Sequence, residues 1–222
     1  MSQHNIIVQA GSSIRLLTAG KYCDRDIVVT AEGSGGGDVG ELDALLDGTL
    51  TELNSNASKV RMYACREIDT LVSVNLPEAK EIGNYAFNLC GELTTFRAPK
   101  IETLGSNAFT SCAKVEEMLF PVLTSVPGYC FRYCSALKKL DIGLAASVAG
   151  YAFGNCTSLE TLIVRRTEGV ATLNSTSFNS ANFAGYIYVP AALVESYKAA
   201  NYWKNYASRI RAIEDYPDIC GT

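Results

Sequence analysis

A six-residue pattern recurs every 22 residues through the middle of the chain, and this repeat constrains the fold more than any other feature. The pattern is Tyr or Asn, then Ala or Cys, then Phe, two variable residues and Cys. Apolar residues three, six and eight positions after each Cys keep the same register. Because one such unit cannot bury its apolar side alone, a period of this length predicts a solenoid of stacked units. The pattern occurs without insertion at residues 85–90, 107–112, 129–134 and 151–156.

The apolar positions that follow each Cys predict one short strand per repeat. Phe96 and Ala98 show the alternation, with a polar residue between them. Stacked strands of this kind form a parallel sheet with a spacing of roughly 4.8 Å. The segment before each strand, such as residues 85–90, predicts a corner in which Phe87 fills the coil. A helix at this corner would last only about one turn.

Residues 82–93, Ile-Gly-Asn-Tyr-Ala-Phe-Asn-Leu-Cys-Gly-Glu-Leu, carry a specific resemblance. They resemble the BspA-like leucine-rich repeats, a bacterial and phage family, and the resemblance covers roughly residues 60 to 190. It implies a β-rich repeat solenoid with short parallel strands, and cell-surface adhesion is the role that the family most often implies. Pro127 and Cys130 depart from the family pattern without changing the apolar register.

The chain divides into five predicted parts. A small β module at residues 1–32 is followed by a Gly-rich linker at residues 33–37, whose composition favours flexibility. Residues 38–60 are expected to form an N-terminal cap of a helix plus a strand, residues 61–185 the solenoid, and residues 186–222 a C-terminal cap. Residues 13–30 also resemble short β modules in tail-associated proteins of phages and prophages of gut bacteria, which implies an attachment role.

The C-terminal cap is expected to contain a strand at residues 186–189, a helix after Pro190 and a closing strand near residues 209–213. Tyr197, Trp203 and Tyr206 stand near one another in the helical part. Aromatic residues at this spacing usually face a core, so cap packing is the favoured interpretation. A platform for carbohydrate is the alternative.

Charge and composition exclude some partners. The 222-residue chain has a net charge of -4, with 19 Lys and Arg against 23 Asp and Glu, and no long basic run. We therefore expect no nucleic-acid partner. No apolar stretch approaches membrane-spanning length, so we expect no membrane insertion. The N-terminus lacks the basic start and apolar centre of a signal peptide, which favours synthesis in a host cytoplasm and a place in a virion over secretion.

The sequence offers little catalytic chemistry. The single histidine is His4, and no zinc-hydrolase signature occurs. The glycines at residues 33–37 are not followed by the Lys-Ser/Thr of a phosphate-binding loop. We therefore expect a non-enzymatic protein with no catalytic residue, no cofactor and no metal site.

Four of the eight cysteines occupy one repeat position and predict a ladder of thiols. Neighbouring Cα atoms would lie roughly 5 Å apart, a distance that does not forbid a disulfide. A buried corner and a cytosolic origin favour reduced structural thiols over zinc or redox use. The ladder consists of Cys90, Cys112, Cys134 and Cys156, whereas Cys23, Cys130 and Cys220 have no assigned role.

Residues between the inward strand positions are expected to face solvent on the open side of the sheet. This mixed polar stripe would suit a protein or a glycan on a host surface, and a solvated face with no partner is the alternative. The predicted binding residues are Asn75, Thr95, Arg97, Glu117, Leu119, Lys139, Asp141, Thr161, Ile163 and Arg165.

Three functions remain open at this point. The first is a phage virion component whose β module binds tail or baseplate proteins while the solenoid contacts the host. The second is a bacterial cell-surface adhesin. The third is an intracellular phage-encoded protein that binds a host protein. The sequence also leaves homo-oligomerisation open.

Overall fold

The computed structural model describes residues 14–17, 24–27 and 51–221. Strands β1 (Ile14–Leu17) and β2 (Asp24–Ile27) pair in antiparallel fashion. They are the described part of the predicted β module. The Gly-rich linker and the helix expected after Asp38 lie outside the described residues.

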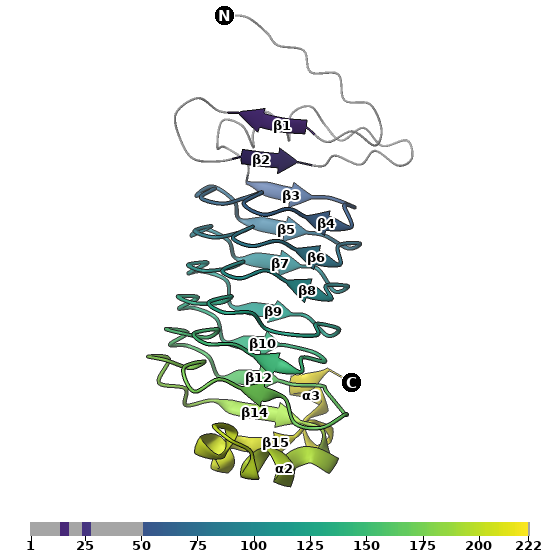
Figure 1. Ribbon diagram of the computed structural model, residues 1–222, viewed down its shortest axis with the longest axis vertical. Helices are drawn as coiled ribbons and strands as arrows, with labels where there is room; N and C mark the ends of the chain where they lie inside the picture. The colour runs from purple at the N-terminus through teal and green to yellow at the C-terminus, as the bar shows by residue number, and fades with distance from the viewer. Residues whose placement is uncertain (1–13, 18–23, 28–50, 222) are drawn as a thin grey trace, which may run out of the picture.

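From residue 52 onward the chain winds into a parallel β-solenoid of about seven turns, as the repeat predicts (Figure 1). One long side is built from β3 (Glu52–Asn54), β5 (Ser73–Asn75) and β7 (Thr95–Arg97), which form a three-stranded parallel sheet. A five-stranded parallel sheet continues that side. Its strands are β9 (Glu117–Leu119), β10 (Lys139–Asp141), β12 (Thr161–Ile163), β14 (Tyr186–Val189) and β15 (Ile210–Ala212). We call these eight strands the long side.

The register of the long side reproduces the sequence period. Leu140 pairs with Leu162, 22 residues later, whereas Thr161 pairs with Tyr186 after an insertion of three residues. A second side carries shorter parallel strands in the same register. These are β4 (Lys59–Val60), β6 (Glu81–Ile82) and β8 (Thr103–Leu104) in one sheet, and β11 (Ser147–Val148) and β13 (Thr172–Leu173) in another.

The first described coil belongs to the solenoid itself. Strands β3 and β4 fall inside residues 38–60, the range predicted as a separate N-terminal cap. They pair in parallel with β5 and β6 of the next coil. Leu53 is only partly buried, yet it packs against the common core.

Stacked phenylalanines fill the interior. Phe87, Phe109, Phe131 and Phe153 are fully buried, and their successive ring centroids lie 5.5, 5.7 and 6.3 Å apart. The ring of Phe178 follows, with its centroid 5.0 Å from that of Phe153. Aromatic rings bury large apolar areas, so this column contributes strongly to the stability of the coil.

The corners are turns and not helices. Tyr85 and Leu89 adopt the left-handed conformation, with φ of 57° and 63°, and the same pair of positions recurs in each of the following three coils. Between them, the amide of Phe87 donates to the carbonyl of Ala108 in the next coil, 2.8 Å away. The amides on either side of it bond within the corner, as that of Asn88 does to the carbonyl of Tyr85 at 3.2 Å. Since every second amide bonds to the next coil, the corner is a series of turns and not a continuous helix.

Buried aromatic rings close the C-terminal end. After β14 come η1 (Ala191–Leu193), α2 (Val194–Ala199) and η2 (Trp203–Arg209). Tyr197 and Trp203 are fully buried, and the Trp203 indole donates to the carbonyl of Ala171 at 2.7 Å. Their burial contradicts the carbohydrate-platform alternative for these two residues. Within the described residues, no helix has both the length and the apolar character needed to cross a bilayer.

Candidate binding face

The outward side chains of the long side divide into an exposed part and a covered part. Over the first coils they are open to solvent. We define the open face as the five exposed residues Asn75, Thr95, Arg97, Glu117 and Leu119. Lys139, Thr161 and Arg165 are half-buried, whereas Asp141 and Ile163 are buried.

The expectation that Asp141 and Ile163 face solvent is therefore wrong. After β15 the chain continues as η3 (Ile213–Asp215) and α3 (Pro217–Cys220), which return over the long side near β10 and β12 (Figure 1). We call residues 213–221 the C-terminal segment. Its Ile213 and Cys220 form a small separate core with Ile163 and Tyr188. The sequence pattern did not reveal this cover, because Leu119 is an equally apolar residue in the same outward column and is exposed.

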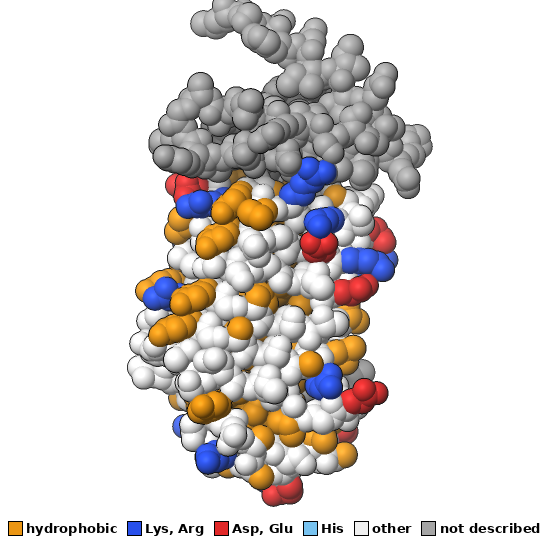
Figure 2. Space-filling view, in the orientation of Figure 1, with side chains coloured by type: hydrophobic (Ala, Val, Ile, Leu, Met, Phe, Trp, Pro, Cys, Tyr) orange, Lys and Arg blue, Asp and Glu red, His pale blue; other side chains and the backbone are white. Residues whose placement is uncertain are grey.

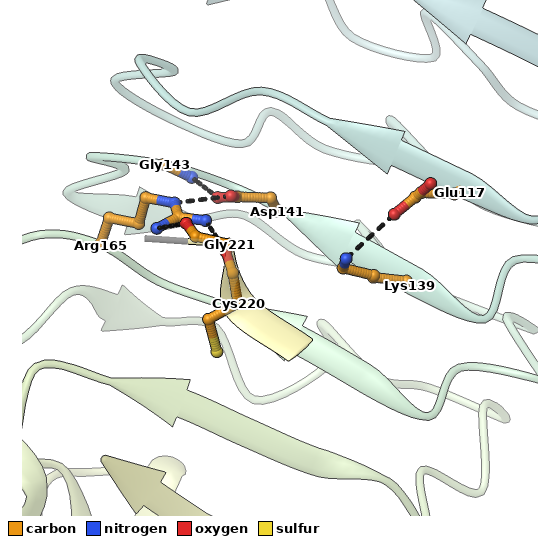
Figure 3. A network of polar contacts seen from close by, with 7 residues as sticks. All are labelled: Glu117, Lys139, Asp141, Gly143, Arg165, Cys220 and Gly221. Atoms are coloured by element: carbon orange, nitrogen blue, oxygen red, sulfur yellow. Dashed lines mark hydrogen bonds and ion pairs between the residues drawn. The ribbon is translucent and has the colours of Figure 1, made fainter. Parts of the chain in front are cut away.

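Arg165 and Asp141 hold this segment in place (Figure 3). The Arg165 Nε donates to Asp141 Oδ2 at 2.6 Å, and its Nη atoms donate to the backbone carbonyls of Cys220 and Gly221. Asp141 Oδ1 accepts from the amide of Gly143 at 2.8 Å. A carboxylate buried with a guanidinium and an amide as donors is well compensated. These two predicted binding residues therefore serve the internal structure.

The open face combines one exposed apolar residue with charged residues. Leu119 is 41% exposed, and Arg97 precedes it in the same outward column on the neighbouring coil. In the adjacent column, Glu117 pairs with Lys139 at 3.1 Å. No acidic side chain within residues 51–221 pairs with Arg97, so its guanidinium is available to a partner.

Charges elsewhere on the solenoid are largely neutralised between coils. On the face shown in Figure 2, blue and red side chains stand beside one another along the right-hand edge, others are scattered over the left and lower parts, and hydrophobic side chains form separate small patches. Several ion pairs join residues 22 apart. They are Lys59–Glu81, Lys80–Glu102, Lys100–Glu78, Lys114–Glu92 and Lys138–Glu116.

The predicted cysteine ladder is buried, and its thiols are free. Each thiol donates to a backbone carbonyl 25 residues earlier; the Cys112 Sγ, for example, lies 3.2 Å from the carbonyl oxygen of Phe87. Burial raises the pKa of Cys112 to about 12 and that of Cys156 to about 12, and it also raises the pKa of Cys90 and of Cys134. A thiol that stays protonated at neutral pH is a poor nucleophile and a poor metal ligand.

Cys130 and Cys220 are also buried, and burial raises the pKa of both thiols. Cys23 and His4 lie outside the described residues. Among the described residues, no group of three or more His, Cys, Asp and Glu side chains is placed to hold a metal ion.

Sequence reasoning missed two tyrosine pairs at the corners. Tyr129 stacks on Tyr151 with ring centroids 5.0 Å apart, and Arg132 lies over both rings. Tyr63 and Tyr85 form the equivalent pair near the other end. The signal was present in the repeat, because Tyr occupies the first position of the six-residue pattern in these coils.

Parallel strands in a 22-residue register, stacked phenylalanines and left-handed corners define a leucine-rich-repeat solenoid. A model of the BspA type leucine rich repeat region matches residues 58–184 in six copies, more than half of the chain. The chain therefore belongs to this family. Among curated proteins, none matches the chain.

Two solved structures are similar to it. A leucine-rich repeat protein of T. pallidum is 18% identical, with a TM-score of 0.48 over 66% of this chain and 78% of that one. A leucine-rich cell surface protein of Faecalibacterium prausnitzii is 19% identical, with a TM-score of 0.35 over 64% of this chain. The match spans 53% of that second protein.

Proposed function

We propose that the chain is a non-enzymatic binding protein whose open face holds a partner protein at a host surface. One observation carries this proposal. The same side of the solenoid already accommodates a polypeptide further along, where the C-terminal segment packs Ile213 and Cys220 onto Ile163 and Tyr188. The first coils present an equivalent surface without such a cover within the described residues.

The chemistry of the open face suits a protein partner. Leu119 offers an exposed apolar contact, and Arg97 can pair with a carboxylate that the partner supplies. Interfaces commonly combine an apolar anchor and an arginine with a polar rim. Asn75 and Thr95 would form that rim.

The finer proposal is a phage tail or baseplate protein that displays the solenoid to the host. The resemblance of residues 13–30 to tail-associated β modules supports it, because such a module would attach the chain to tail proteins. A cell-surface adhesin and an intracellular protein that binds a host protein are the alternatives. Mass spectrometry of purified virions distinguishes them, since only a virion component is present in stoichiometric amount after density-gradient purification.

The proposal is tested by changing the charged and the apolar residue of the open face in one variant. The double variant Arg97→Glu/Leu119→Ser changes two open-face residues. Its matched control is Lys204→Glu/Leu144→Ser, which reverses one exposed charge and removes one leucine that is 44% exposed, against 41% for Leu119. Both double variants should keep the thermal midpoint of the parent chain to within a few degrees.

Binding to envelopes of gut bacteria is then measured by cosedimentation at several chain concentrations. We expect the open-face variant to bind at least about tenfold more weakly, which is the loss of one good interface anchor. The control variant should bind as the parent chain does. Equal binding by all three chains would contradict the proposal.

A further inference from the structure

A groove of about 750 Å³ opens beside the C-terminal segment, away from the open face. Its floor and sides come from three parts of the chain. Tyr186 and Arg211 belong to β14 and β15, Tyr216 and Ile219 to the C-terminal segment, and Glu160 and Thr161 to the start of β12.

Aromatic rings line the groove. Tyr186 is 44% exposed, and Tyr216 is 36% exposed. Tyr188 lies between them, with its ring centroid 6.5 Å from that of Tyr186 and 5.3 Å from that of Tyr216. Tyr188 itself is buried, so the exposed rings of Tyr186 and Tyr216 offer the apolar surfaces and phenolic hydroxyl groups of the groove.

The polar groups of the groove are fixed and nearly balanced in charge. The Arg211 guanidinium lies 4.9 Å from the Tyr186 ring centroid, and its Nη1 donates to the backbone carbonyls of Ser208 and Ile210. These contacts hold the side chain in one orientation. Glu160 lines the same groove and supplies one opposite charge.

We infer that this groove binds a neutral oligosaccharide. A pyranose ring has one face of C–H groups that packs against a tyrosine ring, and hydroxyl groups at its rim that hydrogen-bond to Arg, Glu and Thr side chains. One cation and one anion in the groove leave no surplus charge to favour an acidic sugar.

The proposal does not depend on the open face. The groove begins at β12, two coils beyond Leu119 on β9 and three beyond Arg97 on β7, at the end of the solenoid that the C-terminal segment covers. The double variant Arg97→Glu/Leu119→Ser should therefore bind sugar as the parent chain does, which separates this inference from the proposed function.

Titration calorimetry of the full chain with defined hexasaccharides tests the inference. The probes are maltohexaose, cellohexaose and the hexamer of N-acetylglucosamine, with hexagalacturonate as the acidic comparison. We expect at least one neutral hexasaccharide to bind more tightly than hexagalacturonate. Binding of hexagalacturonate alone, or of none of the four, would overturn the inference.

Substitution of the stacking ring then locates the binding site. Tyr186→Ala should weaken binding about tenfold, and Tyr186→Phe should retain most of it because the ring remains. The control is Tyr133→Ala, which removes a tyrosine that is 43% exposed at a distant corner. If Tyr186→Ala does not fold, Tyr216→Ala takes its place. Equal weakening by Tyr133→Ala and the groove variant would also overturn the inference.

Discussion

The Nε of Arg165 lies 2.6 Å from Oδ2 of Asp141, a carboxylate whose side chain is only 3% exposed. Asp141 stands in the same outward column as Arg97 and Leu119, which are exposed. Asp141 is buried because the C-terminal segment lies over it, and the backbone carbonyls of that segment also accept hydrogen bonds from Arg165. This contact sets the limit between the open face and the covered part of the long side.

Removing the guanidinium should release the C-terminal segment. Arg165→Ala leaves Asp141 buried without its partner and removes hydrogen bonds to a charged group, each of which contributes about 1.5–3 kcal/mol. We expect the thiol of Cys220, buried in the parent chain, to react with a maleimide about tenfold or more faster. Peptide mapping after labelling identifies the site. Lys198→Ala, which breaks an exposed pair with Glu195, is the control and should leave the rate unchanged.

The phenylalanine column should dominate stability. Phe109 is fully buried between Phe87 and Phe131, so Phe109→Ala should cost about 3–5 kcal/mol. Thr95 is exposed, and Thr95→Ala should stay within about 0.5 kcal/mol. Denaturant midpoints of the two variants provide the measurement, and equal midpoints would show that the register of inward and outward positions is wrong.

Glycine is required where successive coils touch. A Cβ on Gly105 would lie 2.2 Å from the amide nitrogen of Asn84, whereas a Cβ on Gly91 would meet nothing within 4 Å. We expect Gly105→Ala to destabilise the chain by about 3 kcal/mol or more, because backbone must move. Gly91→Ala is the matched control. A thermal midpoint for Gly105→Ala as high as that of Gly91→Ala would contradict the close approach of the coils.

The buried thiols should make the fold sensitive to alkali. Their folded pKa values are raised above the ordinary value of 9.0, to about 12 for Cys112 and Cys156, because burial disfavours the thiolate. A group with a raised folded pKa stabilises the fold fully below the unfolded pKa, and this contribution is lost as pH rises through the folded pKa. The free energy of unfolding should therefore fall between about pH 9 and pH 12.

Other groups titrate in the same pH range. The contribution of the thiols to stability is therefore measured by comparing the parent chain with a variant that lacks two of them. The double variant Cys112→Ala/Cys156→Ala should lose less stability over this range than the parent chain does. Each thiol accounts for at most about 1.4 kcal/mol per pH unit. Parallel curves for the two chains would contradict a buried, protonated ladder.

The sequence alone predicts the solenoid because its signal is periodic. Phe87, Phe109, Phe131 and Phe153 recur at one spacing, and a single register places every one of them inside the coil. Tyr197 and Trp203 are buried, as cap packing predicts, but they lie in two separate helices, α2 and η2, so one helical spacing does not account for both. Their partner Ala171 lies too far away in sequence for any local pattern to identify it.

The sequence predicts which residues of the long side point outward, but it does not predict which of these are covered. Alternation places Leu119 and Ile163 at equivalent outward positions, and it cannot tell that Ile163 is covered. That difference depends on the path of the last residues, which carry no repeat. The groove beside Tyr186 was missed for the same reason, because Tyr216 and Ile219 reach it only when the C-terminal segment returns over the sheet.

Hydroxyl-radical footprinting with and without envelopes of gut bacteria tests the central claim most directly. Leu119 and Leu144 are similarly exposed, at 41% and 44%, but only Leu119 lies on the open face. The account predicts that added envelopes lower the oxidation of Leu119 several-fold and leave that of Leu144 unchanged. Oxidation of Leu119 that stays constant, or that falls no more than oxidation of Leu144 does, would contradict a binding role for the open face.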